Sequence, residues 1–182
     1  MKWMIASDIH GSAKWCERML EIWRAAAPDR LVLLGDLLYH GPRNDLPEAY
    51  APKRVIGMLN AVASELLCIR GNCEAEVDQM VLDFPVMADY AALLADGHVI
   101  YLSHGHVYGE DNPPPLKDGD ILLCGHTHVP CLRRHGRFTY VNPGSVSIPK
   151  DGAPHSCCLL EDGEIRWIDL ADGGVFDRQR LY

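Results

Sequence analysis

Two histidines separated by one residue stand at the end of an apolar run in the second half of the chain. His126 and His128 flank Thr127, and the run 120–124 leads directly into them. Imidazoles at this spacing are poorly placed for packing at the mouth of a buried strand, but they are well placed to bind a metal ion. Similar groups at the ends of other apolar runs would strengthen this interpretation.

Four further polar groups follow apolar runs, and each contains a glycine. They are Asp8-Ile9-His10-Gly11, Gly35-Asp36, Gly71-Asn72-Cys73 and Ser103-His104-Gly105-His106. Taken singly, such residues also serve as helix caps and turn formers. Together they supply carboxylate, imidazole and amide groups, a ligand set that suits Mn²⁺, Fe²⁺, Zn²⁺ or Co²⁺ better than Ca²⁺. The combination predicts a metal centre.

The first half of the chain alternates strands and helices, which places these groups at strand ends. Apolar runs predict strands at 2–7, 30–34 and 65–69, and helical spacing predicts helices at 13–26 and 52–63. A strand–helix–strand–helix–strand order implies a parallel sheet with right-handed crossovers. Ligands of such sheets bind beyond the carboxyl ends of the strands, where the polar groups lie.

The second half of the chain is richer in strands. Strands are predicted at 98–103 and 120–124, then as two hairpins and an edge strand, at 131–134 with 138–141, 156–160 with 164–170, and 175–181. No linker or repeat interrupts the chain. We expect a single α/β domain over residues 1–182, built as a four-layer α/β/β/α sandwich of two mixed β-sheets flanked by helices.

Composition limits the classes of partner and the compartment. The 182 residues carry a formal charge of −8 and no basic run, which argues against long nucleic acid as a partner. Two bound divalent cations would reverse that charge locally and admit a small phosphate ester. Seven cysteines without a Cys-x-x-Cys pair indicate reduced thiols. Apolar stretches too short for a membrane span and the lack of a leader pattern predict a cytoplasmic protein.

The order of the polar groups resembles that of a known family. The pattern D-x-H, G-D, G-N, H and G-H-x-H over residues 8–128 is similar to that of calcineurin-like metallophosphoesterases. The phrases at 35–44 and 142–150 resemble the small bacterial phosphodiesterases of the YfcE type. The same compact fold resembles the vacuolar-sorting retromer subunit. The resemblance extends over nearly the whole chain and weakens after residue 151.

This resemblance implies a ligand set and a reaction. One divalent ion would be bound by Asp8, His10, Asp36 and His128, and a second by Asp36, Asn72, His104 and His126, so that Asp36 bridges them. Mn²⁺ is the expected metal, with Ni²⁺, Fe²⁺, Zn²⁺ and Co²⁺ as alternatives. The implied function is a phosphodiesterase that hydrolyses a small phosphodiester, with some monoesters as further substrates, by in-line attack of a metal-bridging hydroxide.

One position departs from many members of the superfamily. Asn72 is expected to act in catalysis, and the residue after it is often a histidine thought to protonate the leaving group, whereas this chain has Cys73. A thiol with an ordinary pKa of about 8.5 is a poor acid for an alkoxide, so good leaving groups should be favoured. His106 is the candidate substitute. Arg43 is expected to bind a non-bridging phosphate oxygen, with Asn44 beside it in the substrate-binding set.

The sequence leaves two alternative functions and the oligomeric state open. A retromer-like scaffold would use the fold for protein contacts, and a nuclease would act on short oligonucleotides. The complete ligand set favours the phosphodiesterase over the first, and the acidic charge and the lack of aromatic platforms favour it over the second. A homo-oligomer, dimer or tetramer, is expected. His40, His98, His135 and His155 are expected to be surface or structural residues.

Overall fold

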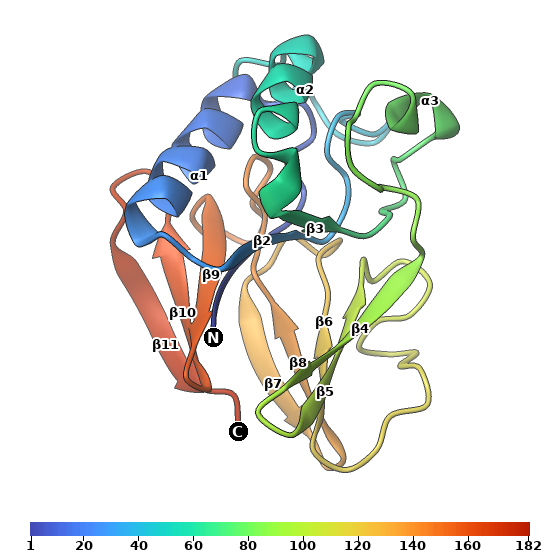
Figure 1. Ribbon diagram of the computed structural model, residues 1–182, viewed down its shortest axis with the longest axis vertical. Helices are drawn as coiled ribbons and strands as arrows, with labels where there is room; N and C mark the ends of the chain where they lie inside the picture. Colours follow the sequence, from blue (N-terminus) through green and yellow to red (C-terminus); the bar gives the residue numbers. More distant parts are fainter.

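Six strands form a first mixed sheet in the computed structural model, which describes residues 1–182. The strand order is β11-β10-β9-β1-β2-β3 (Figure 1). Neighbours β1, β2 and β3 are parallel to one another. The pairs β1–β9, β9–β10 and β10–β11 are antiparallel. The bounds are β1 (Lys2–Ala6), β2 (Arg30–Leu33), β3 (Leu66–Cys68), β9 (Ser156–Glu161), β10 (Glu164–Asp169) and β11 (Val175–Arg180).

Two helices cover one face of this sheet, and both lie on the same side of it in Figure 1. Helix α1 (Ala13–Ala26) begins at Ser12, whose Oγ accepts a hydrogen bond from the Trp15 backbone N–H at 3.4 Å. Its buried residues recur at helical spacing, and they are Ala13, Trp15, Cys16, Met19 and Leu20. Helix α2 (Pro52–Asn60) has a proline in its first turn and packs beside α1.

The second mixed sheet has five strands in the order β4-β5-β6-β8-β7. Strands β5, β6 and β8 are parallel, and the outer strands β4 and β7 are antiparallel to their neighbours. The bounds are β4 (Tyr90–Ala95), β5 (His98–Ser103), β6 (Asp120–Leu123), β7 (Cys131–His135) and β8 (Phe138–Asn142).

Alternation along the central strands divides the interior into two cores. In β1, Met4 points to the helices, whereas Ile5 points to the second sheet and packs in a cluster with Ile100 and Val141. Successive side chains of a strand face opposite sides of the sheet, so a strand buried on both sides reads as a continuous apolar run. The Trp167 indole N–H donates to the Asn142 carbonyl at 2.8 Å and ties the two sheets together.

The fold class expected from the sequence is confirmed, because two mixed sheets lie face to face and helices cover the first of them. On the outer face of the five-stranded sheet, Leu122, Cys124 and Tyr140 pack against Leu116 of the 104–119 loop. This loop, and not a long helix, supplies the fourth layer. No helix of the chain has the length and apolar character that crossing a bilayer requires.

Most of the expected elements are present, with shifts of a few residues. The helix expected at 52–63 ends at Asn60, and a 3₁₀ turn, η1 (Ala63–Glu65), follows it. Edge strand β11 is confirmed. Strand β4 and the short helix α3 (Glu76–Gln79) were not expected. The run 90–95 is built from alanine, leucine and one tyrosine, so it lacks a strand pattern of its own and depends on its pairing with β5.

Candidate metal centre

The carboxyl ends of the parallel strands of both sheets meet at one place, and every expected ligand lies there. Asp8 and His10 follow β1, Asp36 follows β2, Asn72 follows β3, His104 follows β5, and His126 and His128 follow β6. The Nε2 atom of His128 lies 3.2 Å from Asp8 Oδ1, and that of His104 lies 3.4 Å from Asp36 Oδ2. Residues from both sheets therefore form a single cluster.

The backbone of this cluster is held in an uncommon conformation. Five of the seven expected ligands have a positive φ, a region that non-glycine residues seldom occupy: Asp8 (60°), His10 (47°), Asp36 (57°), His126 (66°) and His128 (63°). Each such residue costs on the order of 1 kcal/mol or more. Five other non-glycine residues of the chain share this conformation, but nowhere else does it recur among side chains that face one another.

Glycines allow the segments to approach closely. A Cβ at Gly125 would lie 1.9 Å from Ser7 Oγ, and one at Gly71 would lie 2.1 Å from Asp36 Oδ1. Both distances are far below van der Waals contact. A side chain at either position would push the strand ends apart, so the cluster can form only with glycine at positions 71 and 125.

Three imidazoles are oriented by backbone carbonyls. The Nδ1 atoms of His10, His104 and His128 lie 2.7, 2.7 and 2.5 Å from the carbonyl oxygens of Tyr39, Leu34 and Ile148. A carbonyl only accepts, so each Nδ1 carries the proton and donates it. The Nε2 atom of each ring faces the carboxylates, and in the neutral ring it offers its lone pair, the arrangement by which proteins orient metal-binding histidines.

The two aspartates are also fixed by hydrogen bonds. Asp8 Oδ2 accepts from the His126 backbone N–H at 3.0 Å, and Asp36 Oδ1 accepts from that of Cys73 at 2.8 Å. The Asp8 carbonyl accepts from the hydroxyls of Ser145 and Ser147 at 2.9 and 3.1 Å. One oxygen of each carboxylate is therefore held by the protein, while the other faces the imidazoles.

The donor set fits divalent metal ions. Asp8 Oδ1 is fully buried and has no hydrogen-bond partner, although three imidazole Nε2 atoms lie within 3.9 Å of it. An orphaned buried carboxylate oxygen is costly unless a cation neutralises it. Ligand atoms lie within 4.8 Å of one another in two all-buried groups, one of Asp8, His10 and His128 and one of Asp8, Asp36 and His104.

The electrostatics of the cluster favour added positive charge. Burial alone would raise the pKa of Asp8, but the His10, His128 and His104 imidazoles that face its Oδ1 hold the pKa well below its ordinary value. Burial opposes protonation of His104, yet its hydrogen bond to Asp36 and the charges of both aspartates raise its pKa to about 9. Burial, followed by the charge of His104, lowers the pKa of His126 to about 4. In the protein without metal, a proton on His104 takes the place of a cation.

An open cleft of about 480 Å³ lies above the cluster. Its lining contains five of the expected ligands, His10, Asp36, Asn72, His126 and His128, together with Gly41, Pro42, Arg43, Asn44, Cys73, Thr127 and Lys150. The structure thus brings Arg43, Asn44 and Cys73 to the site, as expected. The Asn44 amide nitrogen donates to the His40 carbonyl at 2.8 Å, so this residue also holds the loop that carries Arg43.

The two candidate proton donors differ in position. The Cys73 thiol lines the cleft and accepts a hydrogen bond from the Asn72 amide at 3.2 Å. Burial and the charge of Asp36 raise its pKa, so the thiol stays protonated. His106 is exposed and does not line the cleft; its ring lies 5.4 Å from that of His104 and 6.1 Å from that of His126. Burial and the charge of His104 lower its pKa.

Glu74 is a site residue that the sequence did not reveal. Its buried carboxylate accepts from the backbone N–H groups of Asp36 (2.8 Å), Leu37 (2.7 Å) and Gly71 (2.5 Å). It thereby joins the ends of β2 and β3 beneath the expected bridging aspartate. Its position directly after Gly71-Asn72-Cys73 was the available signal. Lys150 at the cleft mouth was also not assigned a role.

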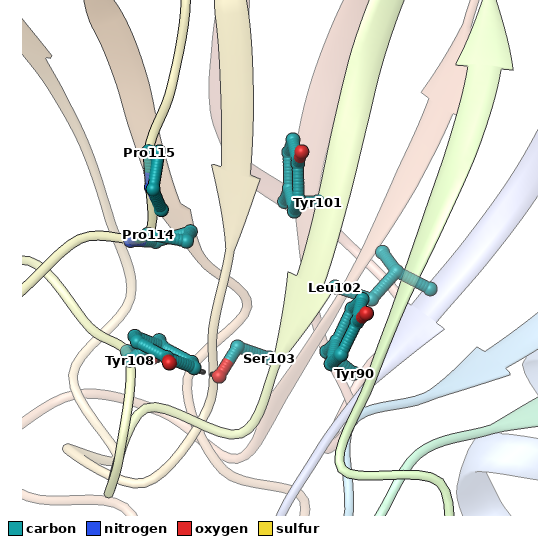
Figure 2. Close-up of a pocket in the computed structure, with 7 residues that line it drawn as sticks. All are labelled: Tyr90, Tyr101, Leu102, Ser103, Tyr108, Pro114 and Pro115. Atoms are coloured by element: carbon teal, nitrogen blue, oxygen red, sulfur yellow. Dashed lines mark hydrogen bonds between the residues drawn. The ribbon is translucent and has the colours of Figure 1, made fainter.

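A second cavity, of about 230 Å³, is separate from the cleft. Figure 2 shows rings of Tyr90, Tyr101 and Tyr108 and the two prolines Pro114 and Pro115 around it, with Leu102 and Ser103. None of these residues also lines the metal cleft. The lining carries no charged side chain, so this cavity is unsuited to a phosphate ester.

Comparison with known proteins agrees with the geometry. Residues 1–163 match the calcineurin-like phosphoesterase superfamily domain. Phosphodiesterase YfcE of Escherichia coli strain K12 is 47% identical over 175 residues, which are 96% of this chain and 95% of that protein. The structure of Yfce, a phosphoesterase from E. coli, covers 100% of both chains at 45% identity with a TM-score of 0.96.

More distant structures share the fold alone. Wild-type Vps29 from Entamoeba histolytica, in complex with Zn²⁺, is 21% identical and covers 100% of both chains with a TM-score of 0.66. The family match and the ligand cluster agree with the expectation of a phosphoric ester hydrolase that binds divalent metal. The chain belongs to the calcineurin-like phosphoesterase superfamily.

Proposed function

We propose that this protein is a metal-dependent phosphodiesterase that hydrolyses small phosphodiesters at a dinuclear centre. The observation that carries the proposal is the cluster beneath the cleft, where two carboxylates and three oriented imidazoles face one another around the orphaned Asp8 Oδ1. The relative named phosphodiesterase, with 47% identity over nearly the full length of both chains, supports the same reaction class.

The seven side chains divide into two ligand sets that share Asp36. The first set is Asp8, His10, Asp36 and His128, and the second is Asp36, Asn72, His104 and His126. Short distances support the grouping: Asp36 Oδ2 lies 3.7 Å from His10 Nε2 and 3.4 Å from His104 Nε2, so it faces one ligand of each set. Asn72 Oδ1 lies 3.1 Å from His104 Nε2. Mn²⁺ is the metal we expect, with Ni²⁺, Fe²⁺, Zn²⁺ or Co²⁺ able to replace it.

When bound, two divalent ions supply charge neutralisation and a hydroxide near neutral pH for in-line attack on phosphorus. The chain orients the reactants. Arg43 at the cleft mouth binds a non-bridging phosphate oxygen, and Asn44 fixes its loop. Asn72 directs its amide toward both His104 and the Cys73 thiol.

Departure of the alkoxide is the step that the chain supports least. The Cys73 thiol has a raised pKa, and the lowered pKa of His106 leaves that imidazole neutral at pH 7. Neither group is an efficient proton donor under these conditions, because the thiol holds its proton too tightly and the imidazole is mostly without one. We therefore expect the enzyme to favour esters with good leaving groups.

The test compares metal-free and Mn²⁺-restored protein on bis(p-nitrophenyl) phosphate, with a short oligonucleotide as a second substrate. Turnover should require the metal and be lost in Asp36→Asn together with most of the bound Mn²⁺, measured by elemental analysis. Asp111→Asn removes the same charge from an exposed residue far along the chain and should retain both. Equal, negligible turnover with and without every metal would contradict the proposal and favour a scaffold role.

A further inference from the structure

Lys150, at the mouth of the metal cleft, has no role in the proposed reaction. It lies between β8 and β9 and lines the cleft together with Thr127 and Arg43. Its side chain is exposed and forms no ion pair with any carboxylate of the chain. An unpaired cation beside a substrate cleft is available to bind an anion.

The backbone of Lys150 is fixed relative to the candidate ligands. Its N–H donates to the His128 carbonyl at 3.3 Å, and its carbonyl accepts from the Ala153 N–H at 3.0 Å. Between them the chain turns through Asp151 and Gly152, which have φ values of 54° and 75°. The base of the side chain is therefore held beside the metal cluster, while its ammonium remains free.

Thr127 adds a hydroxyl to the lining of the same cleft. It stands between His126 and His128, and its Oγ1 accepts from the Asn142 amide at 3.0 Å and the Val129 N–H at 3.4 Å. Because both partners are donors, the hydroxyl proton is left to be donated elsewhere. The Thr127 side chain is exposed at the cleft, where an anionic oxygen would accept that proton.

The charges of the cleft lining differ in sign from those of the whole chain. The formal net charge is −8, yet the cleft lining contains one carboxylate, Asp36 at the floor, and two permanent cations, Arg43 and Lys150. A phosphodiester carries one negative charge at the scissile group, and the metal cluster and Arg43 account for it. Lys150 comes from a different loop and remains for a second group.

We propose that Lys150 and Thr127 form a subsite for a second anionic group, a carboxylate or phosphate, on one arm of the diester substrate. This inference rests on the proposed function and specifies its substrate class: diesters with at least two anionic groups. An ammonium and a hydroxyl donor both bind oxygen anions, and the open position of the subsite suits a substituent that extends out of the cleft.

The test uses three p-nitrophenyl phosphodiesters whose second arm is propyl, 2-carboxyethyl or 2-phosphonoethyl. Wild-type protein restored with Mn²⁺ should show a higher kcat/KM for the anionic arms, and Lys150→Met should lower the ratio of anionic to propyl kcat/KM about fivefold. Lys150→Arg should keep most of the ratio. Lys117→Met, which removes an equal charge from the exposed 104–119 loop, should keep the wild-type ratio.

Binding gives a readout that does not depend on turnover. Titration calorimetry with non-hydrolysable phosphonate analogues of the propyl and carboxyethyl esters should show the same Kd ratio and its loss in Lys150→Met. An unchanged ratio in that variant, by both measurements, would overturn the subsite while leaving the phosphodiesterase intact. Absence of turnover for all three diesters would contradict the proposed function, and the calorimetric ratio would then decide the subsite separately.

Discussion

Nearly every polar atom of Asp8 is used in a hydrogen bond at this site. Its N–H donates to the Gly35 carbonyl, its own carbonyl accepts from two serine hydroxyls, and its Oδ2 accepts from His126. Only Oδ1 is left without a hydrogen bond. A residue held in this way in a left-handed conformation keeps one oxygen available for a cation.

Glu74 should be a positioning residue whose removal affects both stability and metal affinity. Glu74→Ala leaves three buried N–H groups without an acceptor, so the free energy of unfolding should fall by about 2–4 kcal/mol. Mn²⁺ affinity should weaken as well, because Asp36 and Gly71 lose their common support. Denaturant unfolding and metal titration measure the two effects. Glu76→Ala, at an exposed position nearby, should change neither.

Replacement of Cys73 by histidine should restore leaving-group protonation if that step limits the rate. Cys73→His should raise kcat for alkyl esters with poor leaving groups more than for p-nitrophenyl esters, since the latter need no acid. The measurement is log kcat against leaving-group pKa for wild type and variant. Parallel lines of equal slope would show that protonation is not limiting.

At the residue scale, the sequence predicted the ligand types but not what orients them. All seven expected ligands lie in the cluster because apolar strands of a parallel sheet deliver their following residues to one edge. The groups that orient the imidazoles are the carbonyls of Leu34, Tyr39 and Ile148, and any residue type carries a carbonyl. Such partners leave no trace in the sequence.

At the scale of the secondary elements, strand β4 is the one strand that the sequence did not predict. Asp96 and Gly97 have φ values of 51° and 85°, which gives the tight hairpin turn that Asp-Gly favours. The signal was present in the sequence, but the alanine-rich run before it did not suggest a strand. The other long edge strands, β7 and β11, carry charged residues, whereas β4 carries none.

An uncharged edge is the place where we expect a second copy of the chain to pair. Leu94 on β4 is 82% exposed and Tyr90 is 60% exposed. Charges on edge strands prevent pairing between molecules, so their absence favours it. Sedimentation velocity should show a dimer or tetramer for the wild type and a smaller species for Leu94→Lys. Arg178→Ala on β11 is the matched control, and an identical sedimentation coefficient for all three would contradict this assignment.

The stability of the whole molecule depends on pH through the protonation of the histidines and aspartates in the candidate metal centre. Without metal, the pKa of His104 is about 9, above its ordinary 6.5. A raised histidine pKa contributes stability that is complete below about pH 6.5 and is lost as pH rises through about 9. The lowered pKa values of Asp8 and Asp36 contribute stability that is present above about pH 4 and is lost on acidification.

Thermal unfolding of the metal-free protein should therefore shift to lower temperature between pH 7 and pH 9. His104→Gln should remove most of this slope. Mn²⁺ binding requires neutral His104, so the apparent affinity should rise over the same pH interval, by at most about tenfold per unit. Calorimetric scans and metal titrations at pH 7, 8 and 9 measure both. A flat metal-free profile would show that His104 is not protonated in the folded state.

Asp8 and His128 lie 3.2 Å apart in space, although nearly two-thirds of the chain separates them in sequence. The serines that hold the Asp8 carbonyl follow later still, at 145 and 147. During synthesis the ribosome must release almost the entire polypeptide before the first aspartate can meet its partners. We therefore expect divalent ions to bind late in the maturation of this protein, because cations present earlier would find only separate, weak donors.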